Sequence, residues 1–177
     1  MDLKRHVHAD SQDVRSLLLD VHDEVYANNP DPFHSRERFT YFLDCWSSRK
    51  DWRCLSGWES GSPVGYAYGS VLAPGGWWTG SDRPRDVRGP VFALSELMVL
   101  PKWRGTGRAR KIHDALIAPV DAGLVSLQVE SANIKVVRLY ESWGYRKVDT
   151  SKSHDDSPVY AVMVKGRSQQ VPAAFGG

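Results

Sequence analysis

The chain has 177 residues, of which 41% are hydrophobic and 25% charged, as is typical of one globular domain with a substantial core. Its formal net charge of +2, with basic residues spread along the chain, argues against nucleic acid as the principal partner, because such binding neutralises many phosphates. No apolar run reaches the roughly 18 residues of a membrane span, and the N-terminus lacks the apolar stretch of a secretory signal, so we expect no membrane partner and a cytoplasmic location.

The first third of the chain predicts one strand and two helices. Residues 3–7 fit a strand, and Asp10 or Ser11 can cap the helix that follows. The core face of this helix has the 3, 4, 7 spacing of a buried stripe, formed by Val14, Leu17, Leu18, Val21 and Val25. Ser35 begins the second helix, whose apolar face is formed by Phe39, Phe42, Leu43 and Trp46.

The two cysteines are Cys45 and Cys54. Their spacing does not match a metal-ligand pattern, and no further cysteine is available as a partner. We therefore expect two reduced thiols and no bound metal, with Cys45 packed inside the second helix.

The central part of the chain predicts an antiparallel hairpin followed by a long loop. Strands are expected at residues 52–58 and 64–72, because Gly61 and Pro63 provide a turn between them. Residues 73–90 are rich in Gly, Trp, Arg and Asp. A loop of this length in a compact domain is usually functional or mobile.

The second half of the chain predicts alternating strands and helices. Further strands are expected at residues 92–100, 124–129, 145–148 and 159–165. A helix is expected to end at Pro119, with Ala109, Ile112 and Leu116 facing the core. Asn133 caps another helix, which carries Ile134, Val137 and Tyr140 and ends at Gly144 in the C′ position.

These elements give the order βααβββαβαββ. The sequence thus predicts an α/β fold with one mixed central sheet and helices on both of its faces. We expect a single domain over residues 1–165 and a disordered tail over residues 166–177, which has little to bury.

The segment from Leu97 to Ala109 carries the main functional signal, because a strand leads through a two-glycine loop directly into a helix. Free backbone N–H groups in such a loop converge on the positive end of the helix dipole. Gly105 and Gly107 let the backbone approach a ligand closely, so a pyrophosphate fits there. Positive charge around it would come from Lys102, Arg104, Arg108, Arg110 and Lys111.

Other readings of this loop fit less well. The Walker pattern is absent, and a dinucleotide fingerprint would need Gly or Ala where Arg110 stands. The simplest alternative is a solvated basic loop that caps a surface helix.

Two motifs around this loop resemble a known family. Arg104-x-x-Gly107-x-Ala109 resembles the R/Q-x-x-G-x-G/A signature of the GNAT superfamily of N-acetyltransferases. The segment from Asn133 to Tyr145 is similar to that family's N-x-x-A-x-x-L-Y-E-x-x-G-F/Y. The resemblance is specific over residues 92–148 and only topological before them. It implies a GNAT-like fold and an acetyl-CoA-dependent N-acetyltransferase, in which a primary amine attacks directly within a ternary complex.

The resemblance also implies a site for acetyl-CoA as co-substrate. The strand backbone at Leu97, Met98 and Val99 would pair with the pantetheine arm. Asn133 would touch the cofactor while also capping its own helix. The pyrophosphate would be held by the backbone N–H groups of Arg104, Gly105, Thr106, Gly107, Arg108 and Ala109.

Two residues are the leading candidates for catalysis. Tyr140 matches the family position whose phenol can protonate the departing CoA thiolate, although its alternative is a core aromatic. Some relatives place an acidic base where this chain has Gln128, so Glu96 is the first candidate base, Glu130 the second and a water chain the third. Glu96 lies within an apolar strand, where a carboxylate is costly unless it faces a cleft or forms a salt bridge with an arginine. Val136 departs from the alanine common in the family.

The acceptor is expected to be a small-molecule amine in a cleft framed by the first two helices. Aromatic rings with scattered carboxylates suit such an amine, although they also fit ordinary core and loop composition. The residues concerned are Tyr26, Asn29, Asp31, Phe33, His34, Trp77, Trp78 and Asp82. A protein N-terminus or lysine as acceptor, and a non-catalytic acyl-CoA sensor, are the alternatives. A homodimer also stays open, because the family contains dimers but no self-association motif is visible.

Overall fold

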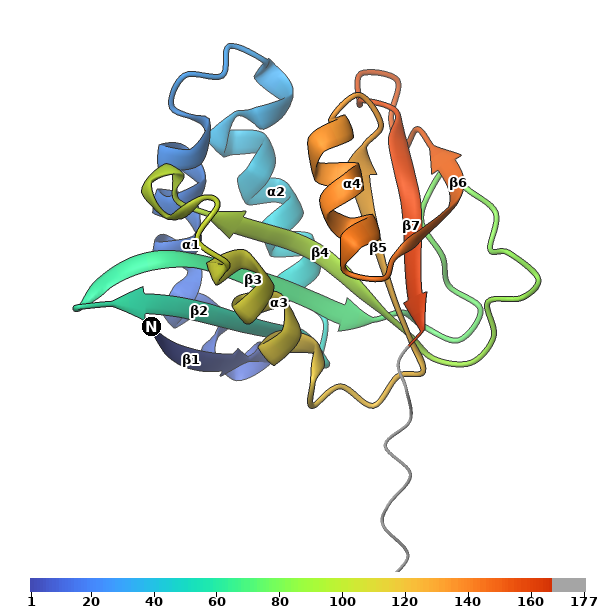
Figure 1. The fold of residues 1–177 in the computed structure, drawn as a ribbon, viewed down its shortest axis with the longest axis horizontal. Helices are drawn as coiled ribbons and strands as arrows, with labels where there is room; N and C mark the ends of the chain where they lie inside the picture. The colour runs from blue at the N-terminus through green and yellow to red at the C-terminus, as the bar shows by residue number, and fades with distance from the viewer. Residues whose placement is uncertain (167–177) are drawn as a thin grey trace, which may run out of the picture.

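The computed structural model describes residues 1–166, and in this range seven strands form one mixed sheet of order β1-β2-β3-β4-β5-β7-β6 (Figure 1). The strands are β1 (Asp2–Val7), β2 (Arg53–Glu59), β3 (Ser62–Val71), β4 (Val91–Val99), β5 (Leu124–Glu130), β6 (Arg146–Ser151) and β7 (Tyr160–Gly166). Within the described sheet β4 and β5 are parallel, and the other neighbouring pairs are antiparallel. Gly166 belongs to β7, and the rest of the predicted tail, residues 167–177, lies outside the described residues.

Helices cover both faces of this sheet, which confirms the predicted fold class and element order (Figure 1). They are α1 (Ser11–Tyr26), α2 (Arg36–Ser47), α3 (Arg108–Ile117) and α4 (Ile134–Ser142). On one face Leu18 of α1 packs in the same core as Tyr66. On the other face Ile112 of α3 packs with Ala67, the neighbour of Tyr66 on β3. None of the helices within residues 1–166 combines the length and apolar character that crossing a bilayer requires.

Local sequence chemistry sets several helix ends as predicted. The side chains of Ser35 and Asn133 each accept the backbone N–H three residues further on, at 3.3 Å. Gly144 follows α4 with a φ of 89°, a left-handed conformation that glycine adopts without a steric cost. Asp10 precedes α1, but its carboxylate accepts the N–H of Val7 instead of capping the helix.

The prediction that Cys45 packs inside α2 is wrong. The buried side of α2 is formed by Phe39 and Leu43, which repeat at helical spacing. Cys45 lies two residues after Leu43, about 200° further round the helix axis, and its side chain is exposed. Cys54 is buried in β2, and both thiols are free.

The parallel strands β4 and β5 pair over only part of their length. Residues Val91–Leu94 lie in register with Leu124–Leu127, whereas β4 continues to Val99 and β5 to Glu130. Beyond the shared stretch, the described pairing continues between β4 and β3 and between β5 and β7. The two strands therefore diverge near the middle of the sheet, and their inner edges offer backbone groups to a ligand (Figure 1).

Candidate functional site

A cavity of about 1680 Å³ opens where β4 and β5 diverge. The β4 segment 94–99 and the β5 segment 127–130 line it, together with the start of α3 and the inner side of α4. The connection between α1 and α2 closes the opposite side with Asn29 and His34. Segments more than a hundred residues apart therefore contribute to one site.

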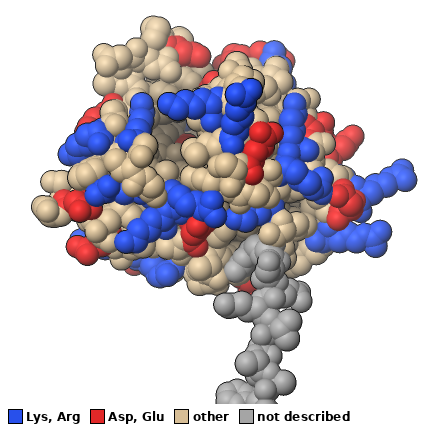
Figure 2. All heavy atoms as spheres, in the orientation of Figure 1, with Lys and Arg blue, Asp and Glu red and all other residues tan. Residues whose placement is uncertain are grey.

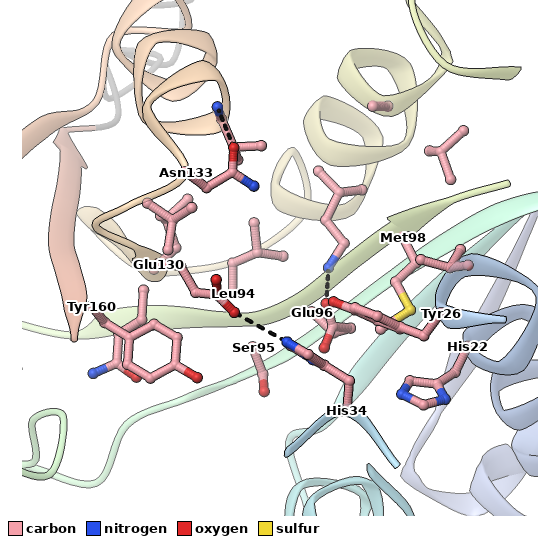
Figure 3. Close-up of a pocket in the computed structure, with 18 of the residues that line it drawn as sticks. His22, Tyr26, His34, Leu94, Ser95, Glu96, Met98, Glu130, Asn133 and Tyr160 are labelled. Atoms are coloured by element: carbon pink, nitrogen blue, oxygen red, sulfur yellow. Dashed lines mark hydrogen bonds and ion pairs between the residues drawn. The ribbon is translucent and has the colours of Figure 1, made fainter. Parts of the chain in front are cut away.

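A β-bulge at Ser95 decides which face of the sheet Glu96 occupies. Leu94 and Glu96 lie opposite consecutive residues of β3, so Ser95 is an extra residue without a partner of its own. Leu94 lies in the core beneath α3, and a regular strand would put Glu96, two residues on, on that same face. The bulge reverses the alternation, and Glu96 lies beside Tyr26 and Met98 toward α1 (Figure 3).

The carboxyl group of Glu96 lines the cavity and accepts the N–H of Leu97 at 3.2 Å. Burial raises the pKa of Glu96 to about 7, although the Leu97 hydrogen bond opposes this rise. Among the described residues, Glu96 forms none of the arginine salt bridges that the sequence left open. A carboxyl group that titrates near neutrality can accept a proton at physiological pH.

Tyr140, on α4, lines the same cavity and is 8% exposed. Its ring meets Trp143 edge to face at 5.3 Å and Tyr145 at 5.5 Å. Burial, followed by the nearby charge of Glu96, raises the pKa of Tyr140, so the phenol stays protonated at neutral pH. Tyr140 is therefore a packed core aromatic that also lines the cavity.

The predicted anion loop forms a cradle of backbone N–H groups at the start of α3. Gly105 and Gly107 have φ values of 73° and 78°, which favour glycine, and a side chain at either position would meet open space. Within the described residues, the backbone N–H groups of residues 105–110 donate to no backbone carbonyl. The first backbone hydrogen bond of α3 runs from the N–H of Lys111 to the carbonyl of Gly107. Unpaired backbone N–H groups at a helix start favour an anion.

The basic side chains around the cradle are partly neutralised. The Arg108 guanidinium lies 3.2 Å from Glu59 and stacks on Trp103 at 4.2 Å, and it does not line the cavity in the described range. Arg110 pairs with Asp114 at 2.6 Å. Figure 2 shows Lys and Arg side chains bordering a hollow on this face. The other basic residues that line the cavity near the cradle are Arg104, Lys135 and Arg138.

Opposite the cradle, His34 and Glu130 meet across the cavity. His34 Nε2 lies 3.2 Å from Glu130 Oε1, and the His34 ring stacks on Tyr26 at 4.3 Å (Figure 3). Tyr160 of β7 lies in register with Glu130 and lines the cavity beside it. The sequence had no signal for Tyr160, because its place depends on the pairing of β5 with β7.

The other predicted acceptor residues divide into two groups. The cavity is lined by Tyr26, Asn29, Phe33, His34 and Trp78. Trp78 lies on the predicted long loop and donates its indole N–H to Ser126 at 2.8 Å. Asp31, Trp77 and Asp82 do not line the cavity in the described range: Asp31 accepts the N–H of Phe33, Trp77 packs near Val87, and Asp82 is exposed.

Three further positions from the sequence lie at the splayed ends. Asn133 lines the cavity and caps α4. Gln128 faces the cavity and donates its amide N–H to Ser151 at 2.6 Å. Val136 also lines the cavity, on the first turn of α4. Metal-binding groups of three or more His, Cys, Asp or Glu side chains are absent from residues 1–166.

The model of the GNAT acetyltransferase family matches residues 18–145, so the chain belongs to this family. It is also 28% identical over 108 residues to aminoglycoside N(6')-acetyltransferase type 1 of Klebsiella pneumoniae. That match covers 60% of this chain and 53% of the relative, so the chain spans about half the length of the curated relative.

Solved structures share the fold at low sequence identity. The ribosomal-protein-S18-alanine N-acetyltransferase of Escherichia coli superposes with a TM-score of 0.65 at 14% identity, covering 99% of this chain and 100% of that one. The PaiA N-acetyltransferase of Thermoplasma acidophilum, in complex with coenzyme A, superposes with a TM-score of 0.59 at 13% identity, covering 94% and 100%. These likenesses establish the fold.

Proposed function

We propose that the protein binds acetyl-CoA and transfers its acetyl group to a primary amine of a small molecule. The observation that carries the proposal is the joint presence of the amide cradle, Glu96 and Tyr140 in one cavity. One end of that cavity suits a diphosphate, and its centre holds a group able to accept a proton and a group able to donate one.

The residues present fit the cofactor. Residues 105–109 offer backbone donors to the diphosphate, and neither glycine carries a side chain that would fill the space. Leu97, Met98 and Val99 lie on the β4 edge that has left β5, where peptide groups can pair with the amides of the pantetheine arm. Asn133 lies at the end of β5, within reach of the same arm.

In the proposed reaction Glu96 takes a proton from the ammonium form of the acceptor. The amine nitrogen then attacks the thioester carbonyl, a C–N bond forms, and the C–S bond breaks as CoA thiolate leaves. Tyr140 gives its proton to that thiolate, and the second proton of the attacking nitrogen is released as the amide forms and returns to Tyr140 through solvent. The pKa of about 7 lets Glu96 accept a proton at neutral pH, while the buried Tyr140 phenol is available as the donor.

The acceptor end favours a small-molecule amine. His34 and Glu130 join the α1–α2 connection to the end of β5, and both residues line the cavity. Aromatic rings of Tyr26, Phe33 and Trp78 flank this end and can contact a cationic group. The similarity to an aminoglycoside N-acetyltransferase supports a small-molecule amine of this kind.

A thiol-release assay with acetyl-CoA and a panel of amines tests the proposal. The panel contains simple primary amines, an aminoglycoside such as kanamycin, and peptides with free N-termini or lysines. We expect amine-dependent thiol release and a product heavier by one acetyl group. Transfer to peptides alone would replace the acceptor class, and cofactor binding without transfer to any amine would indicate a sensor. Absence of calorimetric binding of both CoA and acetyl-CoA to folded protein would refute the proposal.

A further inference from the structure

A network of hydrogen bonds links α3 to Tyr145, which lies beyond the end of α4. His113 Nδ1 lies 2.7 Å from Asp114 Oδ1, and His113 Nε2 lies 2.7 Å from the hydroxyl of Tyr145. The His113 side chain is completely buried, and Tyr145 is buried as well. The proposed reaction does not use these groups, and their arrangement therefore requires another explanation.

The direction of each hydrogen bond follows from the donors available. The Asp114 carboxylate can only accept, so Nδ1 of His113 carries the hydrogen and Nε2 accepts the hydroxyl hydrogen of Tyr145. Burial lowers the pKa of His113, which keeps the imidazole neutral. Removing either partner leaves a buried ring nitrogen of His113 without its hydrogen bond, which is costly. These hydrogen bonds therefore hold the His113 ring in one orientation.

The same hydrogen-bonded residues contact the aromatic rings around Tyr140. The Tyr145 ring lies 5.5 Å from that of Tyr140, and the Tyr145 N–H donates to the Tyr140 carbonyl at 3.1 Å. The Trp143 ring lies 4.9 Å from His113 and 5.3 Å from Tyr140. His113 is thus connected to the Tyr140 ring through the rings of Trp143 and Tyr145, which precede and follow Gly144 in the sequence.

Such a link is needed because the sheet is open at this point. The cradle begins α3, whereas Tyr140 lies on α4, and the strands beneath these helices share no described pairing beyond Leu94. Strand hydrogen bonds therefore do not fix the distance between the cradle and Tyr140. We propose that His113, through its bond to Tyr145, is a positioning residue that holds Tyr140 in reach of a thioester anchored at the cradle. This inference rests on the proposed function.

Tyr145→Phe tests the link most gently, since it keeps the ring and removes only the hydroxyl. Displacing a reacting group by a fraction of an ångström slows the chemical step by roughly 3- to 10-fold. We expect kcat to fall by about this factor well below the melting temperature, with the calorimetric Kd for acetyl-CoA unchanged within about twofold. The control is Ser70→Ala on β3, which removes the 2.6 Å hydrogen bond from the buried Ser70 hydroxyl to Asp51 and should lower the melting temperature without lowering kcat.

A second measurement does not depend on activity. The ring signal of Tyr140 is followed by NMR in ¹³C-tyrosine-labelled protein and assigned with Tyr140→Phe. His113→Leu should move this signal, whereas Ser70→Ala should not. If the wild type transfers acetyl to no amine, the proposed function fails while this spectrum still decides the link. An unmoved Tyr140 signal in His113→Leu, or an unchanged kcat in Tyr145→Phe with only a lower melting temperature, would overturn the inference.

Discussion

Replacing Glu96 with glutamine should stabilise the protein at alkaline pH. Burial raises the pKa of Glu96 from an ordinary value of 4.5 to about 7. Between these values the folded state binds more protons than the unfolded chain, so the free energy of unfolding falls as pH rises through this window. Each pKa unit corresponds to about 1.4 kcal/mol, so the wild type loses roughly 2–3 kcal/mol between pH 5 and pH 8 through this one group. Glu96→Gln removes that loss.

Urea unfolding at pH 5 and pH 8, followed by tryptophan fluorescence, measures the effect. The stability of Glu96→Gln relative to wild type should rise by about 2–3 kcal/mol between the two pH values. Glu141→Gln, an exposed carboxyl-to-amide change on α4, is the matched control and should show no such rise. If the difference in the free energy of unfolding between Glu96→Gln and wild type were the same at both pH values, Glu96 would have its ordinary pKa. The reasoning from burial would then be refuted.

The remaining predictions concern the proposed reaction. Tyr140→Phe should lower kcat by about 100- to 10,000-fold with little change in calorimetric affinity for acetyl-CoA, and unchanged turnover would remove its role as acid. At saturating substrates, kcat of the wild type should rise about tenfold between pH 6 and pH 8 as Glu96 ionises; this rise should disappear in Glu96→Gln, and its persistence there would assign the base elsewhere. Gly107→Ala strains a residue with a φ of 78° by about 1 kcal/mol and should weaken acetyl-CoA binding several-fold, whereas Gly123→Ala, at an open position without positive φ, should bind normally.

Much of the fold was predictable because its signals are local. Helical spacing identified the face of α1 that contains Val14, Leu18 and Val21, and all three are buried. The cap at Asn133 and the stop at Gly144 bounded α4 correctly, since each depends on a few neighbouring residues. Cys45 shows the limit of such reasoning, because its residue type favoured burial while its angular position on α2 exposes it.

The two motifs also carried a site-level prediction that remains to be tested by experiment. They placed Tyr140 and the cradle in one site, while Glu96 was added as the first candidate base from its place on the strand, and the structure brings all three to one cavity. Asp31, Trp77 and Asp82 were assigned to the acceptor side, although they do not line this cavity within the described residues. Loop residues are harder to place, because their positions depend on anchors such as the bond between Trp78 and Ser126.

The sequence by itself determined the element order, the two-layer covering of the sheet, the glycine loop and the identity of the polar groups. The tertiary structure alone decided the bulge at Ser95, the divergence of β4 from β5, and the meeting of His34 with Glu130. The physical reason is that helix periodicity, caps and turns depend on residues close along the chain. Strand register and cavity shape depend instead on hydrogen bonds between distant segments, and a shift of one residue moves a side chain to the opposite face.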